Sequence, residues 1–171
     1  MPKKVFNNVV DHRLLDNGSV VEDVTSVALP SIEHPTTSIK STGMVGDVDM
    51  PNTARVNAME LTINHNKGVN HHLLTSPGKH NIELRLARQV YDTPRGEITP
   101  ESVKYRFVCV HKKTDKGNVE NDNPMATVDT FSVLRFEEIV NGSTTVLIDV
   151  MAGILKFNGK DYASEIQKLL E

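Results

Sequence analysis

The sequence predicts a mainly β, antiparallel fold in one domain of 171 residues. Two runs rich in β-branched and aromatic residues, 127–140 and 143–151, are separated only by Asn141-Gly142. Asn-Gly suits a two-residue type I′ turn, whose twist matches the strands that it joins. Three further runs alternate apolar and polar residues with the period of a half-buried strand: 58–64, 82–90 and 103–109.

A two-residue turn also predicts the register of the hairpin. The expected cross-strand partners are Val140 with Ser143, Phe136 with Leu147, Val133 with Val150, and Phe131 with Ala152. In this register Phe136 and Leu147 share one face, while Phe131, Val133 and Ile148 lie on the other. Because both faces then carry apolar residues, something must cover the second face. A helix of the same chain is the simpler cover, and a neighbouring subunit is the alternative.

Composition and charge exclude several classes of protein. Charged residues make up 24% of the chain, and the net charge of -3 argues against a basic nucleic-acid reader. The residues after Lys3 and Lys4 are too polar for the apolar core of a signal peptide, and no apolar run approaches the length of a membrane span. Cys109 alternates with apolar neighbours on a predicted strand, which favours a buried, inert thiol.

The first third of the chain contains two segments without clear periodicity. Residues 1–17 mix apolar side chains with Asn and Asp, and we expect an irregular arm that is ordered only by packing. A β-rich run, 19–29, ends at Pro30. The segment 30–57 is longer than most loops of compact domains, and such loops tend to be functional or disordered. A strand from Ile39 and a turn at 43–46 would make it an extended hairpin or arm.

Two short helices are expected. One spans 68–75, before Pro77-Gly78. The other spans 162–170, where Asp161 is a plausible N-cap and the apolar residues form one stripe. After the short strand 154–157, this C-terminal helix could cover the second face of the hairpin.

The sequence offers little support for catalysis, metal or a cofactor. Four histidines lie within a short span, but they have no zinc-site spacing, and surface or interface positions are the expected reading: His65, His71, His72 and His80. No nucleophile-elbow motif is present, and the side chains of Glu137 and Glu138 should diverge on a strand. These observations argue against an enzyme. A β-barrel that holds a small ligand stays open as an alternative, although aromatic residues are only 5% of the chain.

Four stretches together resemble the major tail tube proteins of contractile-tailed bacteriophages and phage-tail-like bacteriocins. They are 27–33 ahead of 39–46, then 82–92, Ile148-Asp149, and 157–162 leading into the final helix. Their order and spacing extend over nearly the whole chain. The resemblance implies an antiparallel β-sandwich or barrel with a flanking helix and a short C-terminal helix, which forms hexameric rings that stack into a tube.

The resemblance also implies partners and interfaces. The expected partners are further copies of this chain, the tail sheath, a baseplate or tube initiator and a tape measure protein, with DNA as non-specific cargo and no membrane anchor. Expected interface residues lie in the 30–57 segment: Ile39, Gly43, Met44, Gly46 and Pro51. Glu83 and Glu137 are candidates for the lumen, where an acidic surface would let DNA slide without binding. Alternatives are a type VI secretion-like tube protein, the ligand-binding barrel and an enzyme with a dispersed site.

Overall fold

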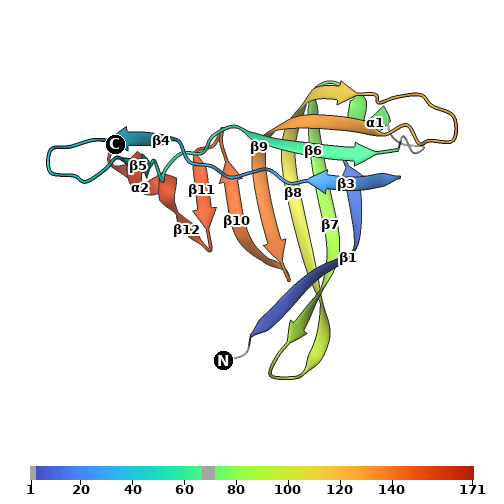
Figure 1. The fold of residues 1–171 in the computed structure, drawn as a ribbon, viewed down its shortest axis with the longest axis horizontal. Coiled ribbons are helices and arrows are strands. Elements are labelled where there is room, and N and C mark those ends of the chain that lie inside the picture. The colour runs from blue at the N-terminus through green and yellow to red at the C-terminus, as the bar shows by residue number, and fades with distance from the viewer. Residues whose placement is uncertain (1–2, 67–71) are drawn as a thin grey trace.

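A computed structural model describes residues 3–66 and 72–171 of the chain (Figure 1). The predicted mainly β, antiparallel fold is confirmed, because ten strands form one large sheet and two more form a separate hairpin. The strands are β1 (Lys4–Asp16), β2 (Ser19–Val21), β3 (Val24–Ala28), β4 (Thr36–Ile39), β5 (Val48–Pro51), β6 (Met59–His65), β7 (Lys79–Asp92), β8 (Glu97–Asp115), β9 (Thr127–Val140), β10 (Ser143–Asp149), β11 (Ile154–Phe157) and β12 (Lys160–Asp161). The helices are α1 (His72–Thr75) and α2 (Tyr162–Lys168).

The large sheet is built around the long strands β7, β8 and β9. Its order is β12-β11-β10-β9-β8-β7-β1-β2, and β6 pairs with the first half of β9 while β3 pairs with β6. The turn between β9 and β10 has the predicted chemistry, with positive φ at both Asn141 and Gly142. Val140 faces Ser143 there, as expected.

Beyond this turn, the predicted register is wrong because β10 contains a bulge. Thr145 is the extra residue of β10, so Phe136 pairs with Ile148 rather than with Leu147. Leu134 is the extra residue of β9 against β8. The pairs expected for Val133 and Phe131 do not form either, since β10 ends at Asp149 and the first half of β9 pairs with β6.

The two bulges explain why the hairpin does not have the two apolar faces that its sequence suggested. A bulge changes which face later side chains point to, so Phe136 returns to the side of Phe131 and Val133. All three side chains are buried in one core. The opposite side of the hairpin carries mainly polar residues, so it needs no apolar cover.

Both helices lie on the core side of the sheet. Leu74 of α1 and Ala163 of α2 belong to the same buried cluster as the strand residues. The predicted N-cap of α2 is confirmed, since Asp161 Oδ1 accepts hydrogen bonds from the backbone N–H groups of Ala163 and Ser164. The helix predicted at 68–75 is present from His72 onward, and its first part lies outside the described residues.

The N-terminal segment is a strand and not the irregular arm that we expected. β1 runs antiparallel to β7 with two irregularities, one between Val5 and Asn7 and one between Val9 and Asp11. These bulges break the alternation by which a strand is recognised in a sequence. Beyond them the pattern is regular, with Leu14 and Asp16 both buried.

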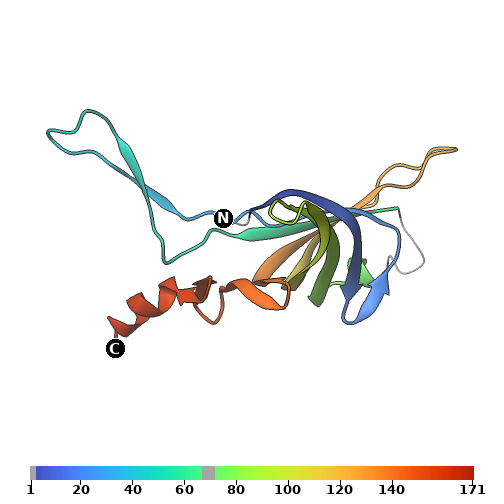
Figure 2. The same cartoon turned by 90° about the horizontal axis from the view of Figure 1, so that it is seen from below.

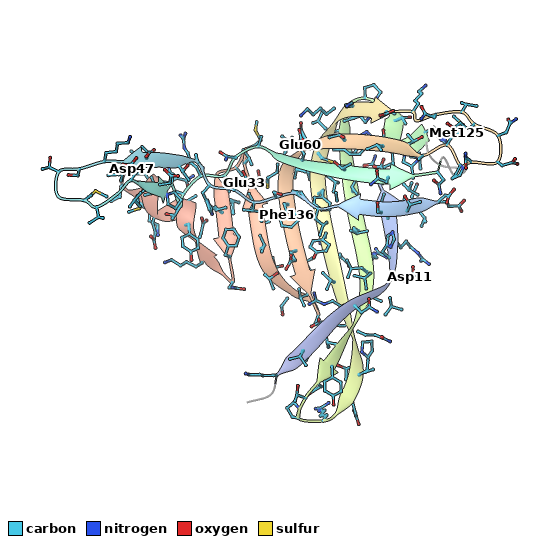
Figure 3. All side chains as sticks on the ribbon, viewed as in Figure 1. Asp11, Glu33, Asp47, Glu60, Met125 and Phe136 are labelled. Carbon is cyan, nitrogen blue, oxygen red and sulfur yellow. The ribbon has the colours of Figure 1, made fainter. Side chains whose placement is uncertain are left out.

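The segment 30–57 projects from the body as an arm built on the β4–β5 hairpin (Figure 2). The strand that we expected to start at Ile39 does not form; β4 covers Thr36–Ile39 instead and ends at that residue. The tight turn lies at 41–44 rather than 43–46: the Met44 N–H donates to the Ser41 carbonyl at 3.1 Å, and Gly43 has φ of 94°. Asp47, near the outer part of the arm in Figure 3, pairs with Lys40 at 3.2 Å.

Candidate assembly surfaces

The arm exposes apolar side chains that the other described parts of the chain do not cover. Every residue of β4 and β5 is exposed, and the two strands pair only with each other. The exposed large apolar residues of the arm are Ile39, Met44, Val45, Val48 and Met50. Exposed apolar clusters of this kind are typical of protein–protein contacts. The predicted interface residues Ile39, Gly43, Met44, Gly46 and Pro51 are thus brought together on one projection.

A notch of about 670 Å³ separates the base of the arm from the C-terminal part of the chain. Residues 52–56 form one wall, and β10, β11 and α2 form the other. Three exposed apolar side chains belong to α2 and the residues after it: Ile166, Leu169 and Leu170. The predicted helical stripe therefore points only partly to the core, because the helix ends at Lys168 and the last residues leave it.

The outer edge of β1 is the longest open edge of the sheet. β1 uses its whole length against β7, but on its other side β2 reaches only Leu14, Leu15 and Asp16. Among the described residues, 4–13 therefore have no strand partner on that side. Val5, Val9 and Val10 are exposed along this stretch. Natural proteins rarely leave so long an edge open, because unpaired N–H and C=O groups recruit other strands.

The face of the sheet that points away from the core carries a concentration of charge, which we call the charged face. The strand registers also place Asp11 and Lys79 on this side, but we define the face by seven residues of β1, β7, β8 and β9: Arg13, Glu83, Arg85, Lys104, Arg106, Arg135 and Glu137. Five of these are cationic in a chain whose net charge is -3. A concavity of about 560 Å³ lies over the middle of this face.

Glu83 is the centre of an ion-pair cluster on the charged face. Its carboxylate pairs with the Arg85 guanidinium and lies 3.8 Å from Lys104 Nζ and 3.6 Å from Arg106 Nε. Partial burial favours the neutral acid, but the hydrogen bond from Arg85 and the three positive charges outweigh it and hold the pKa of Glu83 below its usual range. At neutral pH Glu83 is therefore an anion whose negative charge is balanced by the cations around it.

Glu137 lies on the charged face with Glu83, while two other carboxylates of β9 do not. Glu138 points to the core side, next to Tyr105, and Asp129 is fully buried. Glu83 and Glu137 thus share a face, as candidates for one lumen surface would. Cations outnumber anions among the residues that define this face, so a lumen lined by it would not have the acidic surface that we considered.

Two histidines that we expected on the surface are buried in a polar network. His65 Nε2 lies 2.6 Å from Asp129 Oδ2, and both side chains are fully buried. His80 is held at both ring nitrogens, with Nδ1 2.8 Å from Asp16 Oδ2 and Nε2 2.7 Å from the Ser76 carbonyl. Both histidines lie on strands whose apolar residues alternate with polar ones, and this pattern was the signal in the sequence from which their burial could have been predicted. His71 lies outside the described residues.

The network shows no sign of a metal centre. Among residues 3–66 and 72–171, no three His, Cys, Asp or Glu side chains are placed to hold a metal ion. Asp16 Oδ1 is buried without a hydrogen-bond partner in this part of the chain. Burial raises the pKa of Asp16, and the contact with His80 only partly offsets it. The network is therefore a structural link between β1, β7 and the core.

Comparison with known proteins identifies the family. The family model described as phage tail tube protein FII matches residues 10–170. The chain belongs to this family. The match spans the arm, all the strands of the large sheet after the start of β1, and α2, so every surface described above lies within or beside it.

A solved structure supports the tail tube fold. The chain is similar to the sheath/tube terminator of an extracellular contractile injection system, PVC, seen by cryo-electron microscopy in the extended state. The identity is 10%, the TM-score is 0.52, and the match covers 77% of this chain and 94% of that one. No curated protein sequence matches the chain. In the described residues of this tail tube protein, no helix is long and apolar enough to cross a membrane.

Proposed function

We propose that this tail tube protein forms hexameric rings that stack into the inner tube of a contractile phage tail or tail-like bacteriocin. The long open edge of β1 carries the proposal. A neighbouring subunit that adds a strand to residues 4–13 would satisfy the open backbone groups, and the same contact repeated around an axis closes a ring. The family match supports a structural role of this kind.

The arm and the notch would serve the contacts between subunits or rings. The arm carries an apolar surface away from the body (Figure 2). The notch is lined by residues of the arm base and of α2, so it lies at the same end of the molecule. A contact that repeats from ring to ring without closing extends into a tube. The charged face would then line the lumen, with DNA passing as non-specific cargo if the particle is a phage.

The outer surface of such a tube would meet the other components of the tail. Sheath, baseplate or tube initiator and tape measure protein are the partners that this role requires. The chain would be a component of the virion or tail-like particle, assembled in the bacterial cytoplasm. A type VI secretion-like tube protein would assemble through the same kind of contacts, and particle composition distinguishes the two.

Negative-stain electron microscopy of the purified protein over a concentration series tests the proposal. We expect rings or hollow tubes with a stain-filled centre, and light scattering of the rings should give six times the mass of one chain. Val10→Lys places a charge on the open edge and should reduce ring formation strongly. Val119→Lys, an equally drastic change at an exposed residue of the 116–126 loop, is the control.

Two results would contradict this function. Monomers at every concentration, even when the protein is mixed with preformed tail tube ends as an initiator, would exclude ring assembly. Rings that form equally well with Val10→Lys and Val119→Lys would exclude the β1 edge as the joining surface.

A further inference from the structure

The charged face combines an excess of cations with one carboxylate that engages most of them. Arg85, Lys104 and Arg106 all lie within ion-pair distance of Glu83. The two arginines remain about half exposed, with side-chain exposures of 53% and 51%. They are therefore accessible to a ligand from solution, while their charge is partly cancelled from within the chain.

The geometry of this cluster resembles an anion site that is already occupied. Arginine and lysine side chains that converge on one oxygen pair are the groups that proteins use to hold phosphate. Here the oxygen pair is the carboxylate of Glu83. Arg85 reaches it from two residues along the same strand, β7, and Lys104 and Arg106 reach it from the neighbouring strand β8. Arg13 and Arg135 extend the cationic surface on either side of the cluster.

Glu137 contributes less to this compensation. It lies across from Arg106 in the strand register, but its recorded hydrogen bond is with the Thr144 hydroxyl, at 3.4 Å. Glu83 is thus the anion on which the charge balance of the face depends.

We propose that Glu83 is an internal counter-anion that prevents the charged face from retaining a polyanion such as duplex DNA. This inference rests on the proposed function, in which the face lines the conduit. Phosphate contacts from Lys and Arg supply most of the sequence-independent affinity of proteins for DNA. A conduit must let its cargo pass, so the cations must be kept from binding it firmly. An internal carboxylate does so without removing the cations.

The charge balance of the face also explains why an acidic surface is not required. A strongly acidic lumen repels DNA, whereas a carboxylate that cancels part of the charge of neighbouring cations weakens their attraction for DNA without making the surface repel it. Because the ion pairs lie at a surface that is open to solvent, salt would weaken both the internal pairing and the attraction to DNA. A surface whose attraction for DNA is weakened in this way suits a polyanion that moves along it.

The test measures binding of the full chain, at a concentration that keeps it unassembled, to a fluorescent 20-base-pair duplex by anisotropy at about 50 mM salt. Glu83→Gln removes the charge and nearly preserves the shape of the side chain. We expect it to bind the duplex about tenfold more tightly than the wild type, with a steeper loss of affinity as salt rises. Glu83→Asp retains the charge and should behave like the wild type.

The matched control is Glu165→Gln, which changes the net charge equally on the exposed surface of α2. It should leave the affinity within about twofold of the wild type, since Glu165 is not on the charged face. Combining Glu83→Gln with Arg85→Gln and Arg106→Gln should abolish the gain. Circular dichroism checks that each variant folds, and Glu83→Ala replaces Glu83→Gln if the amide is not accommodated.

Equal affinities for Glu83→Gln and Glu165→Gln would overturn the inference. So would a gain that persists after the two arginines are removed, since the cluster would then not be its source. The binding assay uses unassembled protein, so its outcome is separate from ring formation. Rings without a gain would refute the counter-anion alone, and a gain without rings would refute the proposed assembly alone.

Discussion

Asp16 is the residue at which the buried network depends most on protonation. Its carboxyl group is almost fully buried, and one oxygen has no partner among the described residues. Because the His80 Nε2–H donates to the Ser76 carbonyl, one proton must also lie between His80 Nδ1 and Asp16 Oδ2. The pair is therefore most stable when it retains that proton.

The stability of the protein should fall as pH rises because of Asp16. Burial raises the pKa of Asp16 in the folded state above its unfolded value of about 3.9, so the folded state binds more protons over that interval. This contribution is complete below about pH 4 and is lost as pH rises through the folded pKa. Asp16→Asn mimics the protonated acid, and melting temperatures measured from pH 4 to 8 should fall less for this variant than for the wild type.

A melting temperature that falls more with rising pH in Asp16→Asn than in the wild type would contradict this interpretation of Asp16. Asp11→Asn is a suitable control, because Asp11 is exposed on the same strand. Its profile should follow that of the wild type.

Cys109 should be chemically silent until the protein unfolds. Burial, and to a smaller extent the charge of Asp16, raise the pKa of the Cys109 thiol to about 12, and the side chain is fully enclosed. A thiol reagent at pH 8 should label the native protein only at the rate of unfolding, and should label it at once in concentrated urea. Rapid labelling of the native protein would show that the core opens locally around β8.

At the scale of elements, the cap of α2 offers a measurable contribution to stability. Asp161 Oδ1 accepts hydrogen bonds from two backbone N–H groups of the first helical turn. Asp161→Ala leaves these groups without the cap, and we expect the free energy of unfolding to fall by about 1 kcal/mol. The urea midpoint measures this loss. Asp47→Ala on the exposed arm should change it by less than about half as much.

Local chemistry explains which elements could be predicted from the sequence. The Asn141-Gly142 turn and the Asp161 cap depend on residues close to one another, so both were predicted correctly. The bulges at Leu134 and Thr145 depend on how each strand meets its partner, and nothing in the local sequence marks them. β1 was missed for the same reason.

The same distinction between features that depend on nearby residues and features that depend on strand pairing applies to the candidate surfaces. The unusual length of 30–57 indicated the arm, because it is a property of the sequence itself. The open edge of β1 could not be predicted, since β1 pairs with β7, which is distant in sequence. The ion pairs of Glu83 depend on the register between β7 and β8, which the sequence pattern did not fix. Net charge was misleading for the charged face, because an average over the chain hides where the cations gather.

At the scale of the whole molecule, the arm should be needed for assembly but not for folding. Its apolar side chains are exposed and contribute nothing to the core cluster. Met44→Asp combined with Val45→Asp should therefore leave the melting temperature within about 1–2 °C of the wild type. The same variant should shorten or abolish tubes in electron micrographs. Val119→Asp is the control, and tubes of normal length with the arm variant would show that the arm plays no part.

The bulge at Leu134 also determines how the length of β9 can change during evolution. A strand is read in steps of two, so removing one residue from a regular part exchanges inward and outward side chains for the rest of the strand. Leu134 is the extra residue, and its removal would leave Val133 facing in, Arg135 out and Phe136 in. Leu134 can therefore be lost without changing which later side chains of β9 face the core. Single-residue gaps between related chains should collect there and at Thr145, and the core and the charged face should keep their places on either side.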